Sequence, residues 1–221
     1  MTANFGERAR RVFVALFLLL AGTAPALAHP HVWIDMTVDL SFDNAKRLNA
    51  LTVAWTFDEF YSAFAVQDFK KLPDGRYDPA DLAKLADVNL ANLKDWHYFA
   101  EVTAGGKPAK LGLARNGGST YDAKAGRLTM TFTVPLVSPV AATAKAPIRF
   151  KIYDPSYYIA IDFVKTDPIH MISGAHDVCT VSTKVPNAEK IWTGLPESAF
   201  MGPKAVVLGS YFATTATLVC P

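Results

Sequence analysis

The sequence predicts an α+β fold, mainly an antiparallel β-sandwich with an inserted helical segment at about residues 58–96. Apolar and polar residues alternate closely over residues 32–42, and this period of two is typical of a strand with one buried face. Further short apolar segments follow, separated by turn-forming residues, as is usual in antiparallel sheet proteins. Helix-start signals are grouped in the insertion, so we expect strands to outnumber helices.

The first two strands are expected to form a hairpin. Within the first, residues 29–42, the side chains of His31, Trp33 and Asp35 fall on the same, more polar face, because side chains alternate along a strand. Residues 50–57 form the second strand after a short connection. This pairing would place the end of the second strand near the start of the first.

A helix is expected directly after the second strand. Asp58 and Glu59 open it, since acidic residues are favourable at a helix N-terminus. Four of its residues are assigned to one face, which is expected to pack on the core: Phe60, Tyr61, Phe64 and Ala65.

A second helix and six later strands complete the predicted fold. Asp78 followed by Pro79 is a typical N-cap and first helical position, and the amphipathic pattern continues to about Trp96. Residues 154–156 form a tight turn that Asp154 is expected to cap. The later strands are expected at residues 98–103, 127–134, 148–153, 157–164, 178–185 and 212–220.

Residues 1–28 have the features of a secretory signal peptide. Three arginines precede an unbroken apolar run at residues 12–21, and an Ala-x-Ala motif ends at Ala28. The run is shorter than the roughly 20 residues that span a bilayer, which argues against a retained anchor. We expect cleavage before His29, leaving a periplasmic protein with no membrane span and a single β-rich domain at residues 29–221.

Charge balance and the lack of common catalytic motifs argue against two classes of function, nucleic-acid binding and catalysis. Residues 29–221 carry equal numbers of basic and acidic side chains. There is no basic cluster interleaved with aromatic residues, which argues against nucleic acid as a partner. The chain lacks HExxH, CxxC and GxSxG motifs, so we expect a protein that is not an enzyme.

Cys179 and Cys220 are expected to form a disulfide in an oxidising compartment; two thiolate metal ligands are the alternative.

Cleavage after Ala28 would leave a histidine at the N-terminus. His29 then offers its α-amine and its ring Nδ1, which can close a chelate ring on one metal ion, and His31 adds a second imidazole. Imidazole nitrogen suits zinc, copper, nickel and cobalt rather than calcium or magnesium. Pro30 has no backbone N–H, which excludes a square-planar mode through deprotonated amides. We expect His29 and His31 to bind a transition metal; solvated terminal histidines are the alternative.

Four more residues are candidates to complete this metal site. Asp58 and Glu59 would face the N-terminus if the first two strands pair, although capping the following helix is an alternative role. His170 and His176 lie in a predicted loop with His-x5-His spacing, and loops carry functional residues disproportionately often.

Three motifs occur in a fixed order: HPHVWID at residues 29–35, WTFDEFYS at residues 55–62 and YDPSYY at residues 153–158. Together with the late cysteine pair they resemble the DUF1007 family over most of the mature chain. The resemblance implies a periplasmic component of a transition-metal transport system. Its partner would be a membrane permease of the nickel/cobalt-transporter type, and zinc uptake is proposed for some members. Only His29 and His31 carry over as ligands.

We therefore expect a periplasmic protein that binds a divalent transition metal, zinc or nickel/cobalt with zinc favoured, and serves a membrane metal permease. The first alternative is a docking or accessory subunit without its own metal site, with aromatic residues such as Trp33, Tyr157 and Tyr158 at its interface. The second is a copper redox enzyme with an N-terminal histidine chelate. That chemistry would need one more, opposed histidine from three candidates: His97, His170 and His176.

Overall fold

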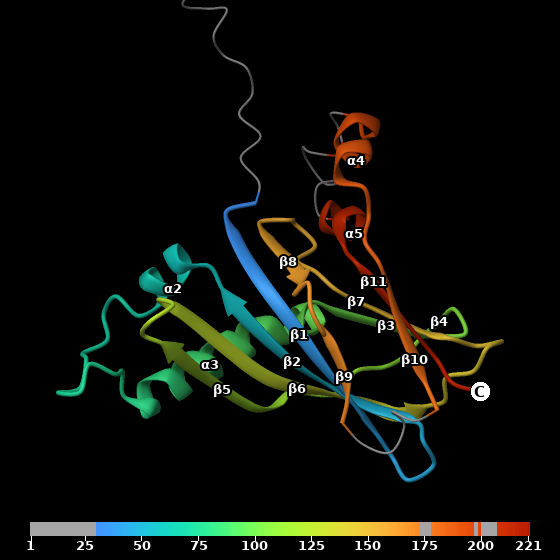
Figure 1. Cartoon of the computed structure of the whole chain (residues 1–221), viewed down its shortest axis with the longest axis horizontal. Coiled ribbons are helices and arrows are strands. Elements are labelled where there is room, and N and C mark those ends of the chain that lie inside the picture. The colour runs from blue at the N-terminus through green and yellow to red at the C-terminus, as the bar shows by residue number, and fades with distance from the viewer. Residues whose placement is uncertain (1–29, 173–177, 197–198, 200–206) are drawn as a thin grey trace, which may run out of the picture.

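The computed structural model of the protein describes residues 30–172, 178–196, 199 and 207–221, and within them the chain forms two β-sheets (Figure 1). The larger sheet has the order β5-β6-β2-β1-β8, with β9 also paired to β1. Its strands are β1 (Val32–Phe42), β2 (Leu48–Phe57), β5 (Arg115–Asp122), β6 (Arg127–Val140), β8 (Ile159–Phe163) and β9 (Ile169–Met171).

The smaller sheet has the order β10-β11-β7-β3-β4. Its strands are β3 (Ala100–Ala104), β4 (Lys107–Pro108), β7 (Ile148–Ile152), β10 (Thr180–Lys184) and β11 (Thr215–Val219). Cys179 and Cys220, which flank β10 and β11, form a disulfide, as predicted. The predominantly antiparallel α+β fold is therefore confirmed.

Strand β1 lies inside the larger sheet. Its buried and more exposed residues alternate along its whole length, as the sequence predicts, but the strand begins only at Val32, after a bend at His31. It pairs antiparallel with β2, with Ile34 opposite Phe57, which confirms the hairpin. On its other side it pairs in parallel with β8 and then β9, with Val32 opposite Ile159. These parallel contacts were not predicted, and they bring the last third of the chain to the first strand.

Both sheets bury one face in a shared core. Trp55 of β2 is almost fully buried, and its ring lies 5.0 Å from that of Phe132 on β6 and 6.1 Å from that of Phe99. From the smaller sheet, Phe150 of β7 and Leu218 of β11 belong to the same buried cluster. Burial of large apolar side chains is the main stabilising contribution to such a fold.

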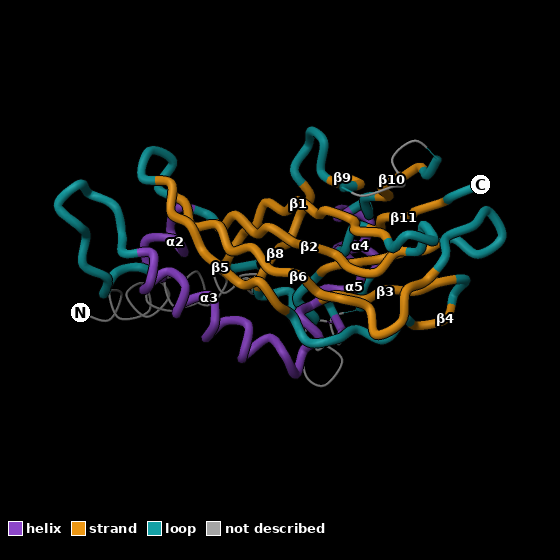
Figure 2. Tube along the Cα trace, turned by 90° about the horizontal axis from the view of Figure 1, so that it is seen from below, coloured by secondary structure: helices purple, strands orange, loops and turns teal. Residues whose placement is uncertain are grey.

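Helices α2 (Glu59–Ala65) and α3 (Pro79–Leu93) lie between β2 and β3 in the chain, followed by the 3-10 helix η1 (Lys94–Phe99). The side chain of Asp78 caps α3, as predicted. Figure 2 shows α3 running along β5. A Cβ atom added to Gly117 of β5 would meet the terminal Cδ1 of Leu90 on α3, so the helix packs closely on the strand at this crossing.

One expectation for α2 is wrong: Phe60 and Phe64 do not pack on the core. Their side chains are 86% and 62% exposed. The other two residues of the predicted face, Tyr61 and Ala65, do pack against the core, and the Tyr61 ring lies 4.6 Å from that of Phe57. Ser62 explains why the side of α2 that carries Phe60 and Phe64 points away from the core. Its buried hydroxyl donates to the Asp58 carbonyl at 2.6 Å and accepts from Leu128 N–H at 2.9 Å, which turns the opposite face toward solvent.

The short helices α4 (Ala188–Gly194) and α5 (Gly209–Phe212) precede β11. No helix among the described residues is long and apolar enough to cross a membrane. The predicted segment at residues 98–103 begins as a strand only at Ala100, because Tyr98 and Phe99 have φ angles of 55° and 59°, in the left-handed region that a strand excludes.

Candidate functional site

The three sequence motifs meet at one end of β1. The N–H of His31 donates to the Tyr158 carbonyl at 2.8 Å, and the N–H of Asp58 donates to the Trp33 carbonyl at 2.9 Å. In Figure 1 this upper end of β1 lies between α2 and the turn that precedes β8. Segments far apart in the chain therefore build one surface, centred on His31 and Trp33.

His31 lies on the outward face of this surface. Its side chain is exposed, and its ring centroid lies 4.7 Å from that of Tyr158, with the planes tilted by 34°. The aromatic ring therefore flanks the imidazole and leaves it accessible. His29, the other half of the predicted chelate, lies outside the described residues.

Asp58 holds the corner between β2 and α2. Its Oδ1 accepts from Tyr61 N–H at 2.8 Å, and its Oδ2 accepts from Trp33 N–H at 2.9 Å. Both oxygens are thus used by backbone donors, so the capping role anticipated as an alternative is observed. Glu59 follows in the first turn of α2 with an exposed side chain.

Arg127 joins three elements beneath this surface. Its guanidinium donates to the carbonyls of Phe57 and Thr56 at 2.7 and 2.9 Å and forms an ion pair with Asp35 at 2.7 Å. Asp162 of β8 lies opposite Asp35 in the register. The Asp162 side chain reaches the surface, but it is partly desolvated by neighbouring protein atoms. This desolvation raises the pKa of the Asp162 carboxyl, and the negative charge of Asp35 raises that pKa further.

The turn before β8 is fixed by Asp154. This buried carboxylate accepts from the N–H and hydroxyl of Ser156 and from Ile159 N–H at 3.0 Å, which confirms its predicted capping role. Tyr157 in the same turn has a φ of 60°, and its ring stacks on Phe212 of α5 at 4.2 Å. The carbonyl that binds His31 therefore comes from a well-supported turn.

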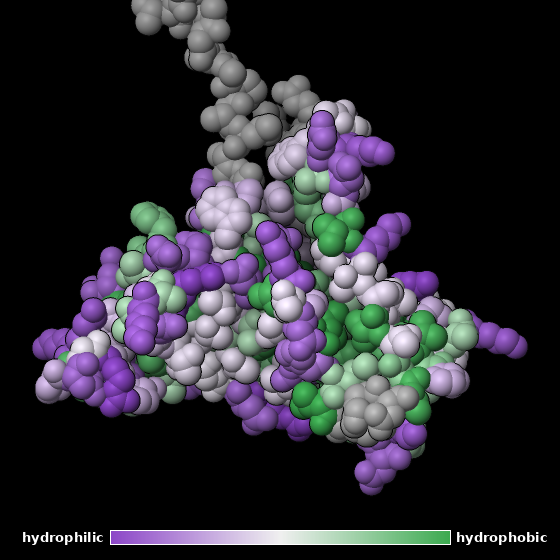
Figure 3. Space-filling model, in the orientation of Figure 1, coloured by the Kyte–Doolittle hydropathy of each residue, from purple (hydrophilic) through white to green (hydrophobic). Residues whose placement is uncertain are grey.

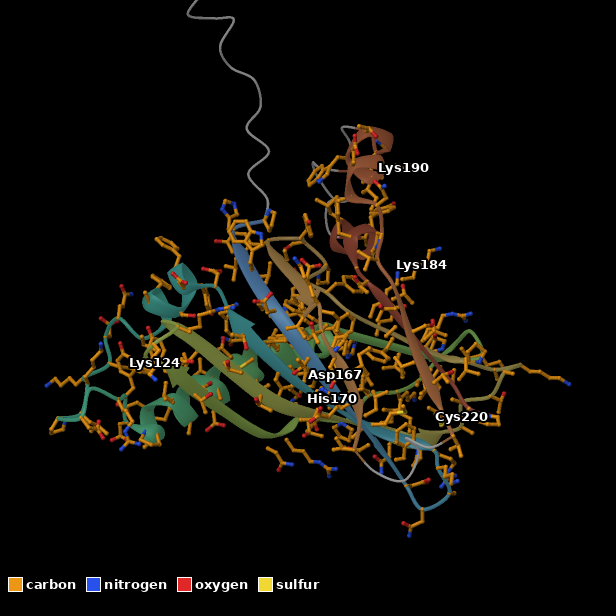
Figure 4. The ribbon with its side chains drawn as sticks, in the orientation of Figure 1. Lys124, Asp167, His170, Lys184, Lys190 and Cys220 are labelled. Atoms are coloured by element: carbon orange, nitrogen blue, oxygen red, sulfur yellow. A yellow bond between two sulfur atoms is a disulfide. The ribbon has the colours of Figure 1, made fainter. Side chains whose placement is uncertain are left out.

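His170 belongs to a separate part of the structure. Its Nδ1 lies 2.7 Å from Asp39 Oδ1, and its Nε2 lies 3.2 Å from Asp167 Oδ2; Figure 4 shows His170 and Asp167 side by side. His170 pairs with Asp39 of β1, eight residues beyond His31, and a strand rises about 3.3 Å per residue. The two histidines are therefore about 26 Å apart along β1 and do not share a metal ion.

His176, the other candidate in that region, lies outside the described residues. Within the described ranges, no group of three or more His, Cys, Asp or Glu side chains is placed to hold one metal ion. The structure thus presents His31 as an accessible imidazole, Asp58 as a structural cap and His170 as the centre of an ion-paired group.

The family model "Protein of unknown function (DUF1007)" matches residues 14–220, almost the whole chain. The chain belongs to the DUF1007 family. No curated protein matches it.

In this DUF1007 protein the ion-paired His170 should make stability depend on pH. The hydrogen bond to Asp39 chiefly raises the pKa of His170 above its usual 6.5, and the Asp167 and Asp39 charges add to this effect. A raised pKa in the folded state stabilises the fold fully below the unfolded-state pKa, and this stabilisation is lost as pH rises through the folded-state value.

We expect His170→Gln to lower the free energy of unfolding by roughly 0.5 kcal/mol at pH 5.5, the scale of an exposed ion pair, and by less at pH 9. Urea denaturation of both proteins at the two pH values measures the difference. An equal loss at both pH values would show that the charge on the imidazole is not what stabilises this contact.

Sequence reasoning missed two features of the DUF1007 surface. Arg127 was treated only as the start of a strand, and the exposure of Phe60 and Phe64 was predicted wrongly. An arginine at a strand end carries no local signal of its partners, whereas the crowding of aromatic residues at positions 57, 60, 61 and 64 is itself a signal. Phe57 ends β2 and is buried there, whereas the seven-residue helix α2 packs Tyr61 on it and leaves Phe60 and Phe64 exposed.

Proposed function

We propose that the mature protein is a non-enzymatic periplasmic carrier that binds a divalent transition metal, zinc favoured, through His29 and His31. It would pass the ion to a membrane permease of the nickel/cobalt-transporter type. The observation that carries this proposal is the exposed imidazole of His31, at the bend just before β1 and two residues after the expected N-terminus. The disulfide supports an oxidising compartment such as the periplasm.

The chemistry of the two histidines fits a cargo ion. In an extended chain, residues i and i+2 lie on the same face about 6.6 Å apart, and a zinc–imidazole bond is about 2.0 Å long. The extended form sets the largest spacing of the two residues, and His31 lies at a bend just before β1, so both rings and the α-amine can reach one ion. A terminal site of this kind has few ligands and stays open, which suits a protein that must release its metal as well as bind it.

The copper redox alternative receives less support. It needs a histidine opposed to the N-terminal chelate, and His170 lies far along β1 with both ring nitrogens next to carboxylates. The docking alternative is favoured by one specific observation, the exposed aromatic side chains beside His31, of which Trp33 is 53% exposed. Docking and metal delivery are compatible functions of the same surface.

We expect His31→Ala to weaken zinc binding at least roughly a hundredfold, because losing even an outer-shell partner of a metal ligand costs about 10–100-fold. Calorimetric titration of protein whose first residue is confirmed as His29 measures this. A second protein, with one residue added before His29, tests the α-amine and should also bind more weakly. Binding should weaken at low pH, since all three nitrogen ligands must be deprotonated.

The control is His97→Ala, which removes an exposed histidine of η1 outside the proposed site. Its zinc affinity should equal that of the unmodified protein. If His31→Ala and the extended protein both bind zinc as tightly as the unmodified one, the proposed site is wrong.

A further inference from the structure

Three large aromatic side chains are exposed on β1 and on the helix that begins beside it. Phe60 and Phe64 are 86% and 62% exposed on α2, and Trp33 is 53% exposed on β1. Asp58 binds the backbone of Trp33 directly, so α2 starts beside this residue. Figure 3 shows green, apolar side chains protruding over α2. We call Trp33, Phe60 and Phe64 the aromatic surface.

The structure holds these residues outward rather than leaving them loosely placed. Residues four apart on a helix lie on the same side, so Phe60 and Phe64 form a pair. Ser62 and Tyr61 fix the opposite side of α2 against β6 and β2, and Asp58 caps the helix. Exposed apolar side chains that are grouped and bordered by polar residues often mark a binding site.

The charges around the aromatic surface are mainly negative. Four carboxylates lie beside or between its residues, and among the described basic side chains Arg127 is the one ion-paired with them. The carboxylates are Asp35, Asp58, Glu59 and Asp162. A second copy of the chain would bring like charges together, and an anionic membrane surface would repel them. A protein with an apolar face and a basic rim is electrostatically complementary.

We propose that the aromatic surface docks this end of the molecule onto such a protein, and that this protein is the one that receives the metal. The second half of the inference rests on the proposed function. His31 comes just before β1 and Trp33 is the second residue of that strand, and both side chains are exposed, so a partner seated on Trp33 also reaches the imidazole. Docking and transfer of the ion would therefore take place on one surface.

The partner can be captured in living cells. The photoreactive residue p-benzoylphenylalanine is introduced at position 60 or 64, and at Val137 as the control. Val137 is 63% exposed and lies at the far end of β6 from Arg127. We expect positions 60 and 64 to crosslink to the same membrane protein, at a segment rich in Lys or Arg, and Val137 not to do so. Equal crosslinking at Val137, or adducts with lipid or with a second copy, would overturn the proposal.

Binding to that membrane protein, purified in nanodiscs, provides the quantitative test. Phe60→Ser with Phe64→Ser should weaken binding about tenfold or more, as expected for central aromatic contacts. Leu113→Ser with Val137→Ser, which removes two equally exposed apolar residues, should leave it unchanged. Glu59→Lys should weaken binding most at low salt, because the charge contribution is screened by salt. Unchanged binding of the double Phe variant would contradict the proposal.

The two proposals can fail separately. The double Phe variant should keep its zinc affinity, because it retains His29 and His31. His31→Ala should lose zinc affinity and lose much less of its affinity for the membrane protein than the double Phe variant does. If zinc binding is absent but the double Phe variant still loses its partner, the docking surface stands and the carrier function fails.

Discussion

Replacing Cys179 and Cys220 together by alanine is expected to lower the free energy of unfolding by about 4 kcal/mol. The disulfide closes a loop with a sequence separation of 41, and a crosslink of this span restricts the unfolded chain strongly. Both cysteines are also buried in the core. The loop contains α4 and α5, and α5 supports the turn before β8 through the stacking of Phe212 on Tyr157. Loss of the disulfide is therefore expected to loosen this support.

Guanidinium denaturation of the double variant, and of the unmodified protein with and without a reductant, measures this effect. Strand β10 pairs with β11 at one margin of the smaller sheet, so hydrogen exchange should rise first in these two strands. A variant whose stability equals that of the oxidised protein would show that the loop is already ordered without the crosslink.

Gly209→Ala is expected to cost about 3 kcal/mol, at the upper end of the usual range for overpacking. A Cβ atom at this position would lie 1.8 Å from the Asp154 carbonyl oxygen and 2.9 Å from its carbon. Both are backbone atoms, which a rotamer change cannot move away. Helix α5 would have to shift from the turn, and the stacking of Tyr157 on Phe212 would be lost with it.

Gly194→Ala is the matched control, because Gly194 lies in α4 and a Cβ atom there meets nothing within 4 Å. It should be neutral or slightly stabilising, since alanine favours helix more than glycine does. Thermal unfolding and near-ultraviolet circular dichroism of both variants provide the comparison. Equal stability of the two would mean that α5 can move away from the turn at little cost.

Local patterns in the sequence predicted the local structure well. The alternation in β1 and the caps at Asp58 and Asp78 are short-range signals, and each has the expected structure. Strands β5 and β9 were missed for physical reasons. Strand β5 contains Gly117 and Gly118, which are typical of turns, and β9 is only three residues long. The parallel pairing of β1 depends on distant residues, which local periodicity does not report.

In the candidate site too, local features were predictable and contacts between distant segments were not. His31 was recognised because it lies two residues from His29, and it lies just before the first residue of β1. The meeting of the first two motifs follows from the predicted hairpin, but the position of the third was not predicted, because it depends on β8 pairing with β1. The contacts of His170 with Asp39 and Asp167 also arise from the fold, so the sequence could identify the histidine and not its partners.

The pairing of β1 with β8 and β9 also constrains the order in which the protein can fold. Val32 pairs with Ile159 and Val38 with Ile169. One edge of the first strand therefore has no pairing partner until most of the chain has been made. Contacts between such distant segments slow folding. The larger sheet therefore cannot be completed until residues 159–171 have been made, which ties the folding of the first strand to the synthesis of a segment more than a hundred residues later.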